Sequence, residues 1–138
     1  KQEKTIETPL PKGSEQILFV DDEPAIVEIG KKFLESLGYH VVTRTSGLEA
    51  LELFKSQSEK FDLVITDMTM PQITGDKLAR ELCTIKKDIP VILCTGFTSI
   101  MTENKAKKMG IKGFLMKPIV RFEMAEMIRQ ILDETKNT

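Results

Sequence analysis

The sequence contains few of the residues on which several common kinds of functional site depend. It has one histidine, His40, and two cysteines, Cys83 and Cys94, whose spacing matches no metal-binding motif. A histidine-rich metal site and a Ser-His-Asp triad are therefore poorly supported. In a chain of this size we expect the two cysteines to be reduced, buried thiols of a cytosolic protein. The pattern G-x-G-x-x-G is also missing, which excludes the nicotinamide-binding fold that depends on it.

Long apolar runs and an excess of one charge are missing as well. No apolar stretch approaches the roughly 18 residues of a membrane-spanning helix, and the polar N-terminus, KQEKTIETP, is unlike a signal peptide. Lys and Arg number 20 and Asp and Glu number 21, so the formal net charge is -1. Bulk charge therefore does not favour direct binding to nucleic acid or insertion into a membrane. We expect a cytoplasmic location, in a parent chain that is either free or tethered to a membrane.

The residues that are present fit one globular domain with short tails. Hydrophobic residues make up 41% and charged residues 30% of the 138 residues, which is enough apolar surface to offset the chain entropy of folding. Residues 1–15 include two prolines and a glycine among polar side chains, and we expect a linker or disordered tail there. We expect the domain over 16–133 and a C-terminal tail over 134–138. Because the first residue is not methionine, we expect a piece of a longer protein.

Short apolar runs alternate along this domain with stretches of helical periodicity. The runs lack polar alternation, which is typical of strands buried on both faces of a sheet. Strands followed by helices in this way predict an α/β fold, with a parallel sheet covered by helices on both faces. The expected strands are 17–20, 41–42, 63–65, 91–94 and 114–116, and the expected helices are 24–37, 46–54, 78–82, 104–109 and 121–132.

Four of the expected strands end in residues that can carry out chemistry. These are Asp21 and Asp22 after the first strand, Asp67 after the third, Thr95 after the fourth and Lys117 after the fifth. In open α/β sheets, ligands bind outside the carboxyl ends of the strands. If the first and third strands are neighbours, their acids converge there, and a hard cation such as Mg²⁺ would hold them together. Acids, a hydroxyl and a lysine around one crevice indicate a phosphoryl-transfer site.

The same residues lie in a series of motifs that resembles the receiver domain of bacterial response regulators in two-component systems. The motifs are V-D-D-E-P at 20–24, I-T-D-M-T-M-P at 65–71, T-G at 95–96 and F-x-x-K-P at 114–118. The resemblance covers about residues 16–133, and the spacing between the motifs fits as well. It implies a flavodoxin-like (βα)5 fold, a doubly wound parallel sheet with the strand order 2-1-3-4-5.

The resemblance implies a role for each of the acids. Asp67 would be the phospho-acceptor, which takes a phosphoryl group from a phosphohistidine as an acyl phosphate. Asp22 would bind Mg²⁺ directly and Asp21 mainly through metal-bound water. The backbone carbonyl of Thr69 would be a further metal ligand, and its side chain stands at a position that tunes dephosphorylation in the family, as does Phe97.

The resemblance also implies how the signal is passed on. Lys117 would pair with the phosphoryl group and, before it arrives, with Asp67. The hydroxyl of Thr95 would move to bond a phosphoryl oxygen, and Phe114 would turn inward as the coupled aromatic residue. Gly96 fits the small residue that this position needs for access of the phosphoryl group.

The implied partner is a histidine kinase or a histidine phosphotransfer protein or domain in a phosphorelay. A homodimer through the face formed by 104–109, 114–116 and 121–132 is also implied. The segment 9–15 and the run L-C-T-G-F at 93–97 look like receivers joined behind the kinase core of hybrid sensor histidine kinases. In that reading the domain is a signalling module, although the parent chain would be a kinase.

Other interpretations use the same residues differently. A phosphatase of the haloacid-dehalogenase type also forms an aspartyl phosphate but needs D-x-D, whereas Asp67 is followed by Met68 and Thr69. A flavodoxin-like FMN binder needs a phosphate-binding loop where this chain has three acids, 21–23. Taken singly, the acids before Pro24 could simply favour a helix N-terminus, and Phe114 could be a core residue.

Overall fold

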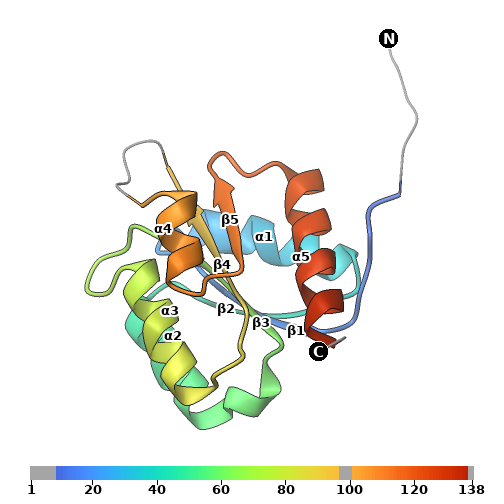
Figure 1. The fold of residues 1–138 in the computed structure, drawn as a ribbon. Helices are drawn as coiled ribbons and strands as arrows, with labels where there is room; N and C mark the ends of the chain where they lie inside the picture. Colours follow the sequence, from blue (N-terminus) through green and yellow to red (C-terminus); the bar gives the residue numbers. More distant parts are fainter. Residues whose placement is uncertain (1–8, 97–100, 137–138) are drawn as a thin grey trace.

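The computed structural model describes residues 9–96 and 101–136, which fold into three layers with a parallel sheet in the middle (Figure 1). The strands pair in the order β2-β1-β3-β4-β5. This confirms the predicted α/β, flavodoxin-like fold and its strand order. The strands are β1 (Gln16–Val20), β2 (His40–Arg44), β3 (Leu63–Asp67), β4 (Val91–Thr95) and β5 (Gly113–Met116). The helices are α1 (Pro24–Ser36), α2 (Gly47–Gln57), the 3-10 turn η1 (Ser58–Lys60), α3 (Gly75–Ile85), α4 (Glu103–Lys108) and α5 (Arg121–Lys136).

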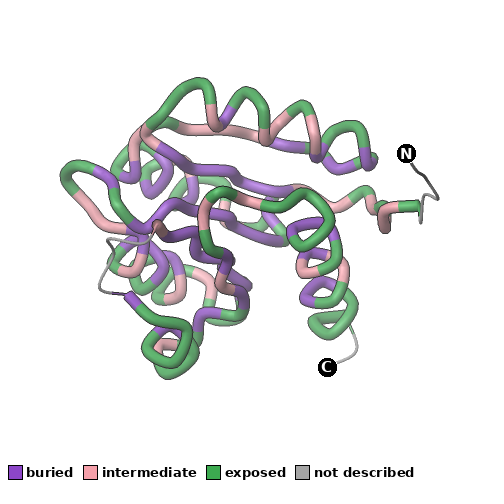
Figure 2. The backbone as a smooth tube through the Cα atoms, turned by 90° about the horizontal axis from the view of Figure 1, so that it is seen from above, coloured by how far each residue is buried: buried purple, intermediate pink, exposed green. Residues whose placement is uncertain are grey.

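The sheet separates two hydrophobic cores because neighbouring residues of a strand point to opposite faces. In β1, Leu18 and Val20 join the core under α2, α3 and α4, whereas Ile17 and Phe19 join the core under α1 and α5. All five residues of β3 and of β4 are buried. Figure 2 shows these buried strands between helices whose outer surfaces are exposed. The buried runs of the sequence therefore predicted the central strands correctly.

The helices follow the sequence signals in outline and depart from them in detail. The hydroxyl of Ser46 accepts a hydrogen bond from the Glu49 amide at 3.2 Å, so this serine caps the N-terminus of α2. Two apolar residues at helical spacing, Ile29 of α1 and Leu48 of α2, are 57% and 43% exposed. The apolar stripe that helical spacing defines is wider than the strip of the helix that contacts the sheet. Apolar residues at the margin of the stripe therefore remain exposed. One cysteine also differs from expectation, since Cys94 is buried but Cys83 is only half-buried.

Both ends of the expected domain are more ordered than their composition indicated. Helix α5 continues through Lys136, so residues 134–136, expected as tail, are helical. At the other end, the amide of Gly13 donates to the Leu37 carbonyl at 3.1 Å and Leu10 packs on the core under α1 and α5. The first eight residues of the expected linker lie outside the described part of the chain. None of the described helices has the length and apolarity needed to cross a bilayer.

Candidate functional site

The acids converge at the carboxyl ends of β1 and β3. These strands are adjacent, and Val20 pairs with Thr66 in their register, so the next residue of each strand follows at the same edge of the sheet. Carboxylate oxygens of Asp21, Asp22 and Asp67 all lie within 4.8 Å of one another. Asp21 and Asp67 are buried and Asp22 is half-buried. The structure therefore brings together the three acids that the sequence analysis selected.

Lys117 supplies the positive charge of the cluster from the other side. Its Nζ lies 2.8 Å from Oδ1 of Asp67 and 3.1 Å from Oδ2 of Asp21. Backbone contacts place it, because the amide of Lys117 donates to the Thr95 carbonyl at 2.7 Å. Asp21 is held from its second oxygen too, since its Oδ1 accepts from the Glu23 amide at 3.0 Å. A single ammonium group thus bridges two buried carboxylates.

The crowding of acids shows in the pKa values of the site. Burial raises the pKa of Asp67 above its ordinary value, and the charges of Asp21 and Asp22 act in the same direction. The hydrogen bond from Lys117 opposes this rise but does not cancel it. For Lys117, burial acts to lower the pKa, but the hydrogen bonds to Asp67 and Asp21 outweigh it and raise the pKa. Without a further cation the site carries more negative charge than one lysine offsets.

The donor set fits a small, hard divalent cation. Three carboxylates converge, and Asp22 makes no hydrogen bond or ion pair with any described residue, so its oxygens are free to bind a ligand. Thr69, two residues beyond Asp67, is exposed, and its carbonyl accepts no hydrogen bond from the described residues. Carboxylate and carbonyl oxygens with room for water are the ligands that Mg²⁺ prefers. Asp21, Asp22, Asp67 and the Thr69 carbonyl are therefore the residues that would hold it.

Thr95 ends β4 and Phe114 lies in β5, and among the described residues neither side chain makes a hydrogen bond to the acids. The buried hydroxyl of Thr95 donates to Sδ of Met116 at 3.4 Å, across the register between β4 and β5. Phe114 is half-buried against the core under α2, α3 and α4. A side chain added at Gly96 would meet no atom within 4 Å, so the position beside Thr95 is open. Phe97 lies outside the described residues.

Met116 is a contact that sequence reasoning missed. It ends β5 and is 44% exposed, yet its sulfur accepts the Thr95 hydroxyl. The two residues meet because Thr95 pairs with Met116 in the register between β4 and β5, a pairing that the sequence of the two strands does not specify. The position of Met116 directly before Lys117 then places it at the rim of the site.

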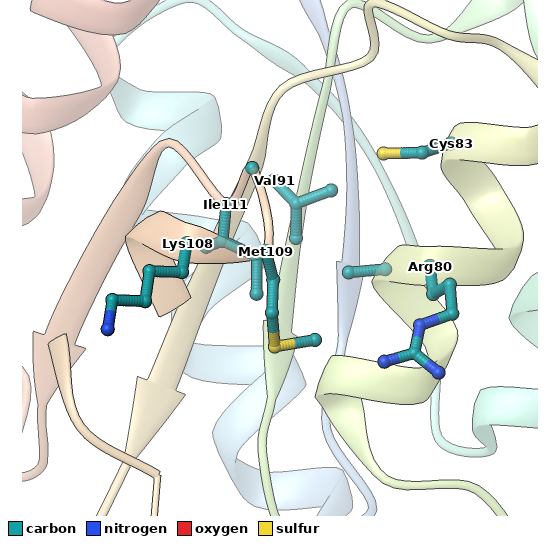
Figure 3. A pocket seen from close by; sticks show the side chains of 8 residues that line it. Arg80, Cys83, Val91, Lys108, Met109 and Ile111 are labelled. Carbon is teal, nitrogen blue, oxygen red and sulfur yellow. The ribbon is translucent and has the colours of Figure 1, made fainter. Parts of the chain in front are cut away.

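A pocket elsewhere on the molecule has no part in this chemistry. It has a volume of about 280 Å³ and lies between α3 and the end of α4 (Figure 3). Cys83 and Arg80 of α3 line one side, and Met109 and Ile111 line the other. No acid of the cluster lines it. Burial also raises the pKa of the Cys83 thiol, which makes it a poorer nucleophile.

Comparison with known proteins agrees with the geometry. The family model described as "Response regulator receiver domain" matches residues 17–129. The chain is 33% identical over 122 residues to the sensor kinase CckA of Brucella abortus, covering 88% of this chain and 13% of that protein. It is 34% identical over 119 residues to the transcriptional regulatory protein GlrR of Escherichia coli, covering 86% of this chain and 26% of that protein. The chain thus spans a small part of the length of these relatives.

Solved structures give the same result for the fold. A response regulator receiver domain protein from Clostridium thermocellum superposes with a TM-score of 0.84 and 33% identity, over 88% of this chain and 97% of that chain. A CheY-like receiver domain protein from Methanospirillum hungatei superposes with a TM-score of 0.82 and 27% identity, over 91% and 98% of the two chains. With three converging acids, a bridging lysine and this match in sequence and fold, the chain belongs to the response regulator receiver domain family of two-component systems.

Proposed function

We propose that this domain takes a phosphoryl group onto Asp67 from a phosphohistidine of a histidine kinase or phosphotransfer protein. The observation that carries the proposal is the setting of Asp67, a buried carboxylate 2.8 Å from Lys117 Nζ and within 4.8 Å of Asp21 and Asp22 oxygens. An oxygen of Asp67 attacks phosphorus, the new O–P bond forms, and the N–P bond breaks. The imidazole nitrogen of the donor keeps the electron pair of that bond.

The neighbours of Asp67 prepare the site for this transfer. Mg²⁺, when bound, neutralises charge on the phosphoryl oxygens. Asp22, Asp67 and the Thr69 carbonyl would hold that ion directly, and Asp21 would act mainly through metal-bound water. Lys117 keeps Asp67 in place before transfer and pairs with a phosphoryl oxygen afterwards. The raised pKa of Asp67 reflects a carboxylate that is poorly solvated by water, which favours its reaction as a nucleophile.

An apolar hollow beside Lys117 supports a docking place for the phosphohistidine donor. It has a volume of about 220 Å³ and lies between α1 and the loop that leads from Lys117 into α5. Ile26, Phe33, Pro118 and Ile119 line it, and Lys117 is part of its wall. Ile29 and Val120, which are 57% and 50% exposed, extend the apolar surface. A donor protein seated here would present its phosphohistidine directly to the site.

The response would appear on the face made by α4, β5 and α5. A phosphoryl group at Asp67 adds acceptor oxygens that can draw the Thr95 hydroxyl away from Met116. Phe114, half-buried in the strand next to Thr95, can then turn inward. Met116 and Phe122 leave apolar side chains exposed on this face, which suits it to partner binding or to a homodimer. We place the domain in the cytoplasm, where histidine kinases present their phosphohistidines.

The test is phosphorylation by phosphoramidate with Mg²⁺, followed by intact-protein mass. One phosphoryl group should be added to the parent chain and none to Asp67→Asn. Asp88→Asn is the matched control, because Asp88 is an exposed acid that precedes β4, at the edge of the sheet opposite the site. A phosphatase of the haloacid-dehalogenase type would instead release phosphate from ester substrates over many turnovers. Such turnover in the parent chain, or an adduct that persists in Asp67→Asn, would overturn the proposal.

A further inference from the structure

Residues 10–15, which precede β1, are bound to the C-terminal half of α5 by a dense set of polar contacts. The guanidinium of Arg129 donates to both carboxylate oxygens of Glu15, at 3.1 Å and 2.7 Å. It also donates to the Lys12 carbonyl at 3.1 Å. Lys136, two turns further along α5, lies 2.6 Å from the same Glu15 carboxylate. These contacts join parts of the chain that are more than 110 residues apart in sequence.

The Glu15–Arg129 pair is shielded from water, which makes it stronger than an ordinary surface ion pair, whereas Lys136 is mostly exposed. The side chain of Glu15 is 9% exposed and that of Arg129 is 19% exposed. The hydrogen bond from Arg129 lowers the pKa of Glu15 from 4.5 to about 2. Surface ion pairs of long, exposed side chains contribute little to stability, whereas a bidentate and largely buried pair contributes more. Glu15 is therefore ionised and bound to Arg129 throughout the physiological pH range.

Close packing of the backbone adds to the ion pair. The Gly13 amide donates to the Leu37 carbonyl at 3.1 Å, and the His40 amide donates to the Glu15 carbonyl at 3.0 Å. A β-carbon at Gly13 would collide with Arg129 and with the ring of Tyr39. The Tyr39 hydroxyl itself accepts from Arg129 at 3.3 Å. The segment thus lies against α5 and the turn between α1 and β2, with no room for a larger residue.

We propose that residues 10–15 form a strap that holds α5 in its docked position and joins it to the chain on the N-terminal side of the domain. Because the strap is fixed to α5 near its end, a displacement of that half of α5 must either carry the strap along or break the Glu15–Arg129 pair. Any segment attached before Leu10 is thereby coupled to α5. Because α5 belongs to the face on which we place the response, a signalling role for this coupling rests on the proposed function. The strap itself does not depend on it.

Hydrogen exchange of the unphosphorylated, metal-free chain tests the strap independently of phosphoryl transfer. Glu15→Gln and Arg129→Gln should each raise exchange about tenfold in residues 129–136 and in residues 10–15 together. In the double variant the exchange rate should rise no more than about twofold further, because the two residues act as one unit. Glu134→Gln is the matched control, since Glu134 is exposed and, among the described residues, its carboxylate accepts a hydrogen bond from Gln130 only. This control should leave the exchange rates of both segments unchanged.

Two further variants cover the case in which loss of the charge pair unfolds the chain. Lys136→Gln keeps Arg129 in place and should raise exchange in both segments by about threefold. Gly13→Ala alters no charge and should open both segments through the collision with Tyr39. Faster exchange in only one segment, or additive effects in the double variant, would overturn the strap. Phosphoramidate labelling of Glu15→Gln should match the parent within about twofold, so failure of the strap and failure of the proposed function remain distinguishable.

Discussion

The ammonium group of Lys117 lies 2.8 Å from Oδ1 of Asp67, although Lys117 follows β5 and Asp67 ends β3, two strands away in the sheet. The long lysine side chain crosses the end of β4, where Thr95 is buried, to reach the acid. The same group lies 3.1 Å from Asp21. One cation therefore pairs with two buried carboxylates without neutralising both, and the remaining negative charge favours binding of a further cation.

The first prediction concerns the stability of the metal-free domain as a function of pH. The pKa of Asp67 is raised in the folded state, so with respect to this group the fold is most stable below the ordinary pKa of 3.8. That stability is lost as pH rises through the raised pKa, because the unfolded state ionises more readily. Asp67→Asn should remove this loss, and at pH 7 it should be at least as stable as the parent. Urea unfolding at a series of pH values measures the free energy of unfolding of the two chains.

Binding of Mg²⁺ should offset the loss of stability that ionised Asp67 causes in the parent chain. At ten times its dissociation constant, Mg²⁺ should stabilise the parent by about 1.4 kcal/mol through mass action. Asp67→Asn should gain clearly less. Equal gains in the two chains would show that Asp67 does not contribute to the cation site.

A second prediction concerns Asp22. Because Asp22 makes no hydrogen bond or ion pair with a described residue, and its charge only repels that of Asp67, Asp22→Ala should not lower the stability of the metal-free chain by more than about 0.5 kcal/mol. It should nevertheless abolish binding of Mg²⁺ and phosphorylation together. Glu23→Ala is the matched control, since Glu23 is exposed and adjacent. Titration calorimetry with Mg²⁺ measures the effect, and an undiminished affinity in Asp22→Ala would remove Asp22 from the site.

A third prediction concerns the hydroxyl of Thr95. Thr95→Ala should still be phosphorylated, because the acids and Lys117 remain, but should fail to change the α4-β5-α5 face. Thr95→Ser keeps the hydroxyl and should respond as the parent does. Amide chemical shifts of residues 101–122 with and without beryllofluoride and Mg²⁺ give the measurement. Shifts in Thr95→Ala equal to those of the parent would mean that another residue couples the site to this face.

A fourth prediction concerns Gly75, at the start of α3. A β-carbon there would collide with the backbone carbonyl of Asp67 and with Leu93, whereas one at Gly96 would meet nothing within 4 Å. Gly75→Ala should therefore destabilise the domain by about 2 kcal/mol and slow its phosphorylation, while Gly96→Ala should be tolerated in stability. Thermal unfolding of the two variants compares them directly. Similar melting temperatures would contradict this account of the close approach.

The sequence predicted the acids of the site because each one follows a buried apolar run. Parallel strands end at one edge of the sheet, so the ends of three strands in that pattern were enough to gather Asp21, Asp22, Asp67 and Lys117. The contact between Thr95 and Met116 depends instead on register, which became visible only once the strands were paired. In helices, too, part of the structure could not be predicted from the sequence. Ile29 fits the apolar periodicity of α1 but is exposed, because periodicity does not determine how wide the buried face of a helix is.

The strap could not be predicted for a different physical reason. Its prolines, glycine and polar residues have the composition of a linker, and nothing local in the sequence distinguishes Glu15 from other surface acids. Its partner Arg129 lies 114 residues away on α5. Such a pair is set by the packing of α5 against β5 and the turn before β2, and that packing exists only in the folded chain.

The most direct test of the central claim is to identify the phosphorylated residue itself. The parent chain is treated with phosphoramidate and Mg²⁺ and then reduced with borohydride, which converts a phosphorylated aspartate into homoserine. Peptide mass spectrometry then locates the homoserine. We predict homoserine at position 67 and at no other acid. Homoserine at position 21 or 22, or a phosphoryl group that resists reduction and lies on another residue, would contradict the account.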